Sequence, residues 1–90
     1  MELIMTPLTE EQKLVSYTKY RCEINDYPII VYDNHSTGQT VVYFQDNTRI
    51  QFRNQITSRS NEPYNEWLLR KLSKFKNIKQ RLAKQPQNKE

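Results

Sequence analysis

The 90-residue chain combines a hydrophobic fraction of 36%, a single cysteine and a formal net charge of +4, which is divided into −4 over residues 1–46 and +8 over residues 47–90. Its size predicts one small domain over residues 1–84 with a thin core and a disordered tail over residues 85–90, and its charge asymmetry favours a polyanionic partner. A disulfide framework is excluded, and no apolar run reaches the ~20 residues of a membrane-spanning helix, so we expect a cytoplasmic protein with no membrane partner.

The first half of the chain predicts a short helix followed by strands. Thr9 and Gln12 form a capping box, which indicates a short N-terminal helix. From Tyr20 to Ile24, apolar and charged residues alternate in the way that is typical of a half-buried strand. An Asn-Asp pair at residues 25–26 interrupts this run, and a second strand is predicted over residues 29–32.

Residues 40–53 predict a β-hairpin. Asp46 and Asn47 tolerate the positive φ of a two-residue turn, and a turn there pairs Tyr43 with Ile50. This register predicts one apolar face and one mixed face, which a shift by one residue would exchange. The predicted core face carries Val41, Tyr43, Ile50 and Phe52, and the opposite face carries Val42, Phe44, Arg49, Gln51 and Arg53.

The last third of the chain predicts a long amphipathic helix. Asn61 suits the N-cap, Pro63 suits the first turn and Pro86 ends the pattern. Apolar residues recur at helical spacing through six turns, at Tyr64, Trp67, Leu68, Leu72, Phe75, Ile78 and Leu82. Packing this stripe on the sheet predicts an α+β fold with a short N-terminal helix, a three- to four-stranded antiparallel meander sheet and a long C-terminal helix on one sheet face.

No set of residues predicts an enzyme, a metal site or a cofactor. The single histidine, His35, lies in a predicted turn with Asp33 and Ser36, whereas catalytic triads draw residues from different elements around a rigid cleft. A zinc site needs several Cys or His ligands, and the chain has only Cys22 and His35. We therefore predict a non-enzymatic protein.

Our leading hypothesis is a small binding protein that docks on a polyanion such as nucleic acid. Helix geometry gathers basic residues in one stripe opposite the apolar face, and an acid at Glu66 is placed to pair with Arg70. On the sheet, an aromatic side chain beside basic residues offers stacking and charge, the combination that binds single strands. The predicted contacts are Arg70, Lys74, Arg81 and Lys84 on the helix, with Arg49, Arg53 and the stacking residue Phe44 on the sheet.

The alternative is a protein–protein interaction module, an adaptor or an inhibitor of a larger assembly. Six tyrosines favour it, because Tyr, Trp and Arg are enriched in interface hot spots. A homodimer is one form of this hypothesis. It would use the apolar end of the helix at Phe75, Ile78 and Leu82, which is expected to extend past the sheet and need cover.

Residues 38–50, which read GQTVVYFQDNTRI, resemble the strand pair of polo-box domains. A polo box has further strands before its helix, which residues 54–62 do not supply. By architecture alone the predicted elements are similar to double-stranded-RNA-binding domains and to the single-strand-binding transcription coactivators. The basic, alanine-rich signature of the former is missing at residues 64–67. We assign no family, because likeness of architecture does not establish function.

Overall fold

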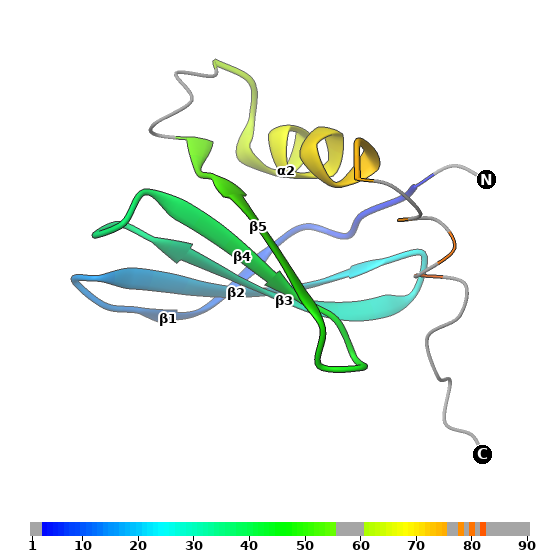
Figure 1. The fold of residues 1–90 in the computed structure, drawn as a ribbon, viewed down its shortest axis with the longest axis horizontal. Helices are drawn as coiled ribbons and strands as arrows, with labels where there is room; N and C mark the ends of the chain where they lie inside the picture. Colours follow the sequence, from blue (N-terminus) through cyan, green and yellow to red (C-terminus); the bar gives the residue numbers. More distant parts are fainter. Residues whose placement is uncertain (1–2, 56–60, 76–77, 79, 81, 83–90) are drawn as a thin grey trace.

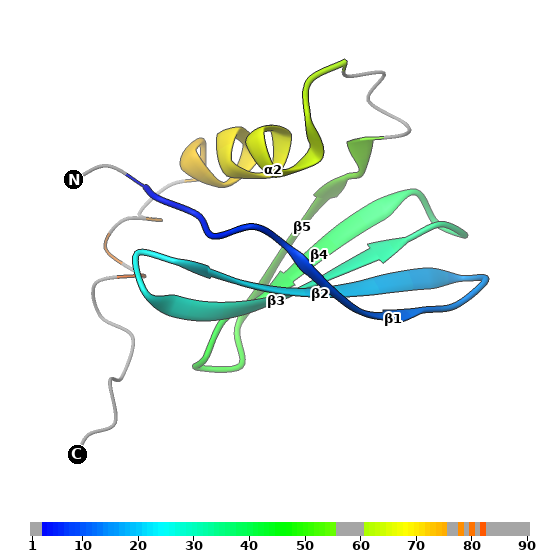
Figure 2. The same ribbon diagram turned by 180° about the vertical axis from the view of Figure 1, so that it is seen from behind.

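The computed structural model describes residues 3–55, 61–75, 78, 80 and 82, so the predicted tail lies outside the described residues. These residues form two layers, a five-stranded antiparallel sheet and a short helix across one of its faces (Figures 1 and 2). The strands pair in chain order, as β1 (Thr9–Lys13), β2 (Tyr17–Ile24), β3 (Tyr27–Asn34), β4 (Gln39–Tyr43) and β5 (Arg49–Arg53), and the helix α2 (Tyr64–Ser73) follows. The antiparallel meander with a C-terminal helix on one face was predicted, but the predicted number of strands, three to four, was too low. No helix in this part of the chain is long and apolar enough to cross a membrane.

The predicted N-terminal helix is wrong, because residues 9–13 form the edge strand β1. Thr9 pairs with Arg21, and Lys13 pairs with Thr18. A helix of one or two turns is marginal in water unless it buries an apolar stripe, and all five β1 residues are exposed. Pairing with β2 satisfies the backbone groups on one side of this polar segment and adds a fifth strand to the sheet.

The hairpin between β2 and β3 confirms the predicted break at residues 25–26. Asn25 and Asp26 have φ values of 51° and 71°. Positive φ at both central residues is typical of a two-residue type I′ turn, whose twist matches that of the strands it joins. Both strands are longer than predicted, and they reach Tyr17 and Asn34.

The hairpin of β4 and β5 is present, but its predicted register is wrong by one residue. Val42, and not Tyr43, stands opposite Ile50. Because side chains alternate along a strand, this shift turns over the whole of β4 relative to the prediction. Val42 is therefore fully buried beneath the helix layer, and Tyr43 lies on the opposite face.

A loop one residue longer than predicted causes this shift. The N–H of Phe44 donates to the carbonyl oxygen of Thr48 at 2.9 Å, which leaves three residues between them. Asn47, the last of the three, has a φ of 70° and donates its N–H to the carbonyl oxygen of Phe44 at 3.0 Å. This is a type I turn followed by a left-handed residue, the common form of a three-residue hairpin loop.

The helix α2 is shorter than the predicted six turns. It begins after Pro63, which occupies the N-cap position predicted for Asn61, and it ends at Ser73. There the Ser73 hydroxyl donates to the carbonyl oxygen of Arg70 at 2.8 Å. Phe75 N–H donates to the oxygen three residues earlier, at 3.1 Å. Hydrogen bonds of three-residue spacing tighten the last turn and end the regular helix.

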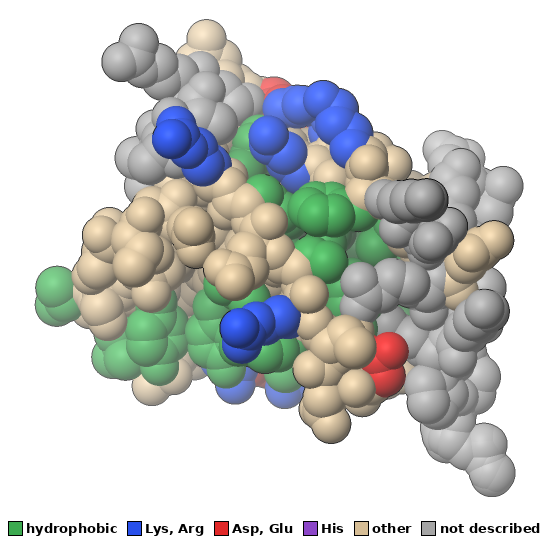
Figure 3. All heavy atoms as spheres, in the orientation of Figure 1, with side chains coloured by type: hydrophobic (Ala, Val, Ile, Leu, Met, Phe, Trp, Pro, Cys, Tyr) green, Lys and Arg blue, Asp and Glu red, His purple; other side chains and the backbone are tan. Residues whose placement is uncertain are grey.

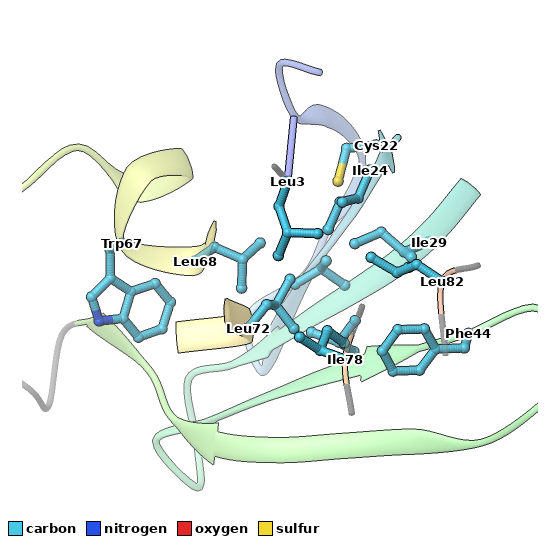
Figure 4. Close-up of a cluster of buried hydrophobic side chains, with 12 residues drawn as sticks. Leu3, Cys22, Ile24, Ile29, Phe44, Trp67, Leu68, Leu72, Ile78 and Leu82 are labelled. Atoms are coloured by element: carbon cyan, nitrogen blue, oxygen red, sulfur yellow. The ribbon is translucent and has the colours of Figure 1, made fainter. Parts of the chain in front are cut away.

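The hydrophobic core lies between α2 and the sheet (Figure 4). Trp67, Leu68 and Leu72 are fully buried on the helix side, which confirms this part of the predicted stripe. Beyond α2, Ile78 and Leu82 are also buried. The apolar surface that was expected to extend past the sheet is therefore covered at these two residues. The strands contribute Cys22, Ile24, Ile29, Val31 and Val42 to the same core, and Phe44, directly after β4, also belongs to it.

Candidate nucleic-acid interface

The face of the sheet away from α2, here called the open face, carries three tyrosines in a row. Tyr17, Tyr32 and Tyr43 lie on β2, β3 and β4, at positions that alternate with the buried residues of each strand. The ring centroids of Tyr17 and Tyr32 are 5.6 Å apart, and those of Tyr32 and Tyr43 are 5.5 Å apart. Both contacts are edge-to-face, an arrangement that aromatic pairs prefer. Three strands thus present one continuous aromatic surface, which we name the tyrosine row.

The tyrosine row lines an open groove of about 690 Å³. Pro28, Ile30 and Val41 also line this groove and add apolar surface between and beside the rings. Figure 3 shows hydrophobic side chains gathered below the strands, on the side away from α2, with lysine or arginine side chains among them. Apolar surface of this kind favours a planar ring over a charged group, because burying the ring releases water from both surfaces.

Basic side chains flank the tyrosine row on two strands. On β2, Lys19 and Arg21 share the open face, and Lys19 Nζ lies 6.0 Å from the centroid of the Tyr32 ring. On β5, Arg49 and Arg53 are exposed and alternate with the two residues that face the helix. We name these four side chains the basic rim. They place positive charge on both sides of the rings.

Two residues of the basic rim are paired with an acid, Glu11 of β1. Its Oε1 lies 3.5 Å from Lys19 Nζ, and its Oε2 lies 2.5 Å from Arg21 Nε. The hydrogen bond from Arg21 lowers the pKa of Glu11, and the same bond raises the pKa of Arg21. Within the described part of the chain, neither Arg49 nor Arg53 forms an ion pair. The β5 side of the rim is therefore the more strongly charged side.

The predicted helix site lies on the other face of the sheet from the tyrosine row. Arg70 donates from Nε to Glu62 Oε1 at 2.8 Å and makes a second hydrogen bond to the same oxygen. This pairing raises the pKa of Arg70. Lys74 is exposed at the end of α2, where Figure 3 shows Lys and Arg side chains gathered over the helix. Arg81 and Lys84 lie outside the described residues.

Phe44, the predicted stacking residue, is a core residue and does not present its ring on the open face or on the helix. Its side chain is 4% exposed and lies in the core with Ile78 and Leu82 (Figure 4). Its predicted position on the face away from the helix is wrong for the same reason as the register. Tyr43, which was predicted to be core, takes that position instead. The predicted position of Arg49 and Arg53 on the open face is confirmed.

Sequence reasoning missed Tyr17 and Tyr32 as candidate site residues. The signal that identifies them is the two-residue period of their strands. On β2, Tyr17 and Arg21 alternate with the buried residues Thr18 and Cys22. The same period separates Tyr32 from its buried neighbours on β3.

The polar residues near the turn after β3 do not form a catalytic arrangement among the described residues. His35 Nε2 and Thr18 Oγ1 are hydrogen bonded at 2.8 Å, but the Thr18 hydroxyl is buried. Asp33 Oδ1 accepts a hydrogen bond from Thr40 Oγ1 at 2.8 Å, and burial raises the pKa of the Asp33 carboxyl.

Burial also raises the pKa of the Cys22 thiol to about 12, so this thiol stays protonated at neutral pH. No cluster of His, Cys, Asp and Glu in the described part of the chain is suited to hold a metal ion.

No family model, no curated protein and no solved structure matches this chain. A functional proposal therefore depends on the tyrosine row and the basic rim alone.

Proposed function

We propose that this protein binds a single strand of nucleic acid across the open face of its sheet. Bases stack on the tyrosine row, and phosphates contact the basic rim. The observation that carries the proposal is the placement of three edge-packed tyrosines on β2, β3 and β4 beside cations of β2 and of the neighbouring strand β5.

Stacking on the tyrosine row supplies the first part of the binding energy. Aromatic side chains on neighbouring strands can each hold one base, and such stacking contributes ~1–3 kcal/mol per base. Tyr32 contacts an aromatic ring on each side, so it is ordered before a base arrives and loses little side-chain entropy on binding. Every base has a flat face, and we therefore expect only a weak sequence preference.

Phosphate contacts with the basic rim supply the second part. Each phosphate that a cation neutralises on a single strand contributes about −0.7 to the slope of log affinity against log salt concentration. Four contacts, one for each residue of the rim, predict a slope of about −3. Binding by stacking alone would be nearly independent of salt.

The basic residues of the predicted helix site have a different part in this proposal. Arg70 and Lys74 lie on the far side of the sheet from the tyrosine row, and Arg70 is held by Glu62. Together with Arg81 and Lys84 they contribute positive charge that attracts a polyanion at a distance. We assign them to this long-range attraction, and we assign direct contact to the basic rim.

The test compares two double variants in a fluorescence anisotropy titration with a labelled oligothymidylate of about 15 nucleotides. Arg49→Gln with Arg53→Gln should lower the affinity about tenfold and make the salt slope shallower by about 1.4. Arg70→Gln with Lys74→Gln removes the same charge from α2 and should lower the affinity only about twofold. A larger loss for the helix pair would place the site on the helix and contradict the proposal.

A protein–protein interaction module is the second candidate, and the apolar surface of the groove favours it. Ile30 and Val41 lie beside the tyrosines, so an acidic peptide segment would find both apolar contacts and cations on the open face. For the homodimer form, Ile78 and Leu82 are buried and Phe75 is partly buried, so the open face offers the larger apolar surface to a partner. Failure of the wild-type protein to bind the oligothymidylate at about 50 mM salt would favour the interaction module over the nucleic-acid proposal.

A further inference from the structure

We infer that Glu11 is an internal competitor for phosphate on the basic rim. The inference rests on the proposed function, since it concerns regulation of the same surface. In the free protein the Glu11 carboxylate forms ion pairs with Lys19 and Arg21, the two cations of the basic rim that lie on β2. A phosphate must displace that carboxylate to bind there.

An irregularity in the edge strand brings Glu11 to this position. The register of β1 against β2 shifts between Glu10 and Gln12, which leaves Glu11 as the extra residue of a β-bulge. Its two carboxylate oxygens are divided between the cations, one toward Lys19 and one toward Arg21. Two oxygens of a phosphate can make the same pair of charge-assisted contacts.

The contact is exposed, and it can therefore be displaced without unfolding the protein. The side chains of Glu11, Lys19 and Arg21 are 30%, 26% and 51% exposed, and all five residues of β1 are exposed. Exposed ion pairs add little to stability and are screened by salt.

Competition of this kind favours a polyanion over a single anion. A small anion must replace the Glu11 carboxylate on its own, with little net gain. A nucleic acid strand that is already held by Arg49 and Arg53 presents its next phosphates to Lys19 and Arg21 at a high effective concentration. Glu11 therefore lowers the affinity of this surface for free phosphate more than its affinity for a nucleic acid strand.

The test uses Glu11→Gln, with Glu10→Gln as the matched control. Both variants remove one negative charge from the same exposed strand. Glu10, however, stands opposite Tyr20, which packs against the core on the helix side of the sheet, and Glu10 makes no ion pair within the described residues. In anisotropy titrations with the oligothymidylate at about 50 mM salt, Glu11→Gln should raise the affinity about fivefold and Glu10→Gln less than about twofold. The difference between the two variants should shrink as the salt concentration rises.

A second measurement reports on the contact itself. The Arg21 Nε–H signal in NMR spectra of the wild-type protein should shift when the oligothymidylate is added, because the donor exchanges a carboxylate for a phosphate. Thermal melts of both variants should stay close to that of the wild type, since the ion pair is exposed.

The outcomes separate the inference from the proposed function. Binding by all three proteins with equal affinities for Glu11→Gln and Glu10→Gln would overturn the inference and leave the proposed function standing. A wild-type protein that binds weakly beside a Glu11→Gln variant that binds well would support both. Absence of binding by all three proteins would overturn the proposed function, and the inference with it.

Discussion

Tyr32 lies edge-on to Tyr43 across two neighbouring strands, with ring centroids 5.5 Å apart. Tyr17 contacts Tyr32 from the other side at 5.6 Å, and Lys19 Nζ lies 6.0 Å from the same ring. These neighbours restrict the rotation of the Tyr32 ring in the free protein. A ring that is already ordered loses little entropy when a base stacks on it. Tyr32 is therefore the member of the tyrosine row on which binding should depend most.

We expect Tyr32→Ala to weaken binding of the oligothymidylate by about 5- to 100-fold, because one base loses its stacking partner. Tyr32→Phe keeps the ring and should bind like the wild type. Anisotropy titrations measure both affinities, and circular dichroism melts check that both variants are folded. Equal affinities for the Ala and Phe variants would mean that no base stacks on this ring.

Adjacent aromatic residues of the β4–β5 hairpin should respond very differently to truncation. Phe44 is buried in the core, so Phe44→Ala should lower the free energy of unfolding by about 3–5 kcal/mol. Tyr43 is half-buried on the open face, so Tyr43→Ala should lower it by only about 1 kcal/mol, through the lost contact with Tyr32. Urea unfolding curves measure both changes. A larger loss for Tyr43→Ala would mean that the hairpin has the register in which Tyr43 faces the helix.

Local signals were enough to predict the meander of strands and part of the helix. The turn at residues 25–26 and the stripe of Trp67, Leu68 and Leu72 depend on residues close together in the sequence. The register of β4 against β5 does not depend on such nearby residues alone. Asp46 and Asn47 suit a two-residue or a three-residue loop, and residues 41–44 are all apolar or aromatic, so either register buries a hydrophobic set. The contact of Phe44 with Ile78 and Leu82, which are distant in sequence, favours the register that the structure has.

The candidate site was predictable to a similar extent. Arg49 and Arg53 lie on the open face in either register of the hairpin, since the alternation of β5 is the same in both. The residue type of Tyr17 and Tyr32 gives no such signal, because a tyrosine suits a core and an exposed sheet face equally well, and only the two-residue period of their strands places them on the open face. Glu11 was misplaced for another reason. Its segment has a good capping sequence, and only the pairing with β2 makes it a strand.

Asp33 gives the protein a stability that should depend on pH in a defined direction. The side chain is 5% exposed, and burial raises its pKa above the ordinary value of 3.8. As the pH rises through 3.8, the carboxyl ionises first in the unfolded chain, so the free energy of unfolding falls until the pKa of the folded state is passed. The buried carboxyl therefore contributes least to stability at neutral pH.

We expect Asp33→Asn to remove this pH dependence and to stabilise the protein near neutral pH. The variant keeps an oxygen that can accept the hydrogen bond from Thr40 and has no charge to bury. Urea unfolding of both proteins from about pH 3 to about pH 6 measures the effect, and the difference in free energy of unfolding should increase with pH. A wild type that becomes more stable than the variant as the pH rises would mean that the ionised form is the one that the fold stabilises.

Glu62 and Glu11 offer the comparison that separates the two faces of the molecule. Each carboxylate holds one arginine, Arg70 on the helix side for Glu62 and Arg21 on the open face for Glu11. Glu62→Gln and Glu11→Gln therefore change the net charge equally but release cations on opposite faces, Arg70 for Glu62 and both Lys19 and Arg21 for Glu11. A strand that lies across the open face gains a direct contact only from Glu11→Gln, so Glu62→Gln should raise the affinity for the oligothymidylate by less than about twofold. Equal gains would mean that attraction follows net charge and that neither face is a localised site. A larger gain for Glu62→Gln would place the strand on α2, and the tyrosine row would then have to serve another partner.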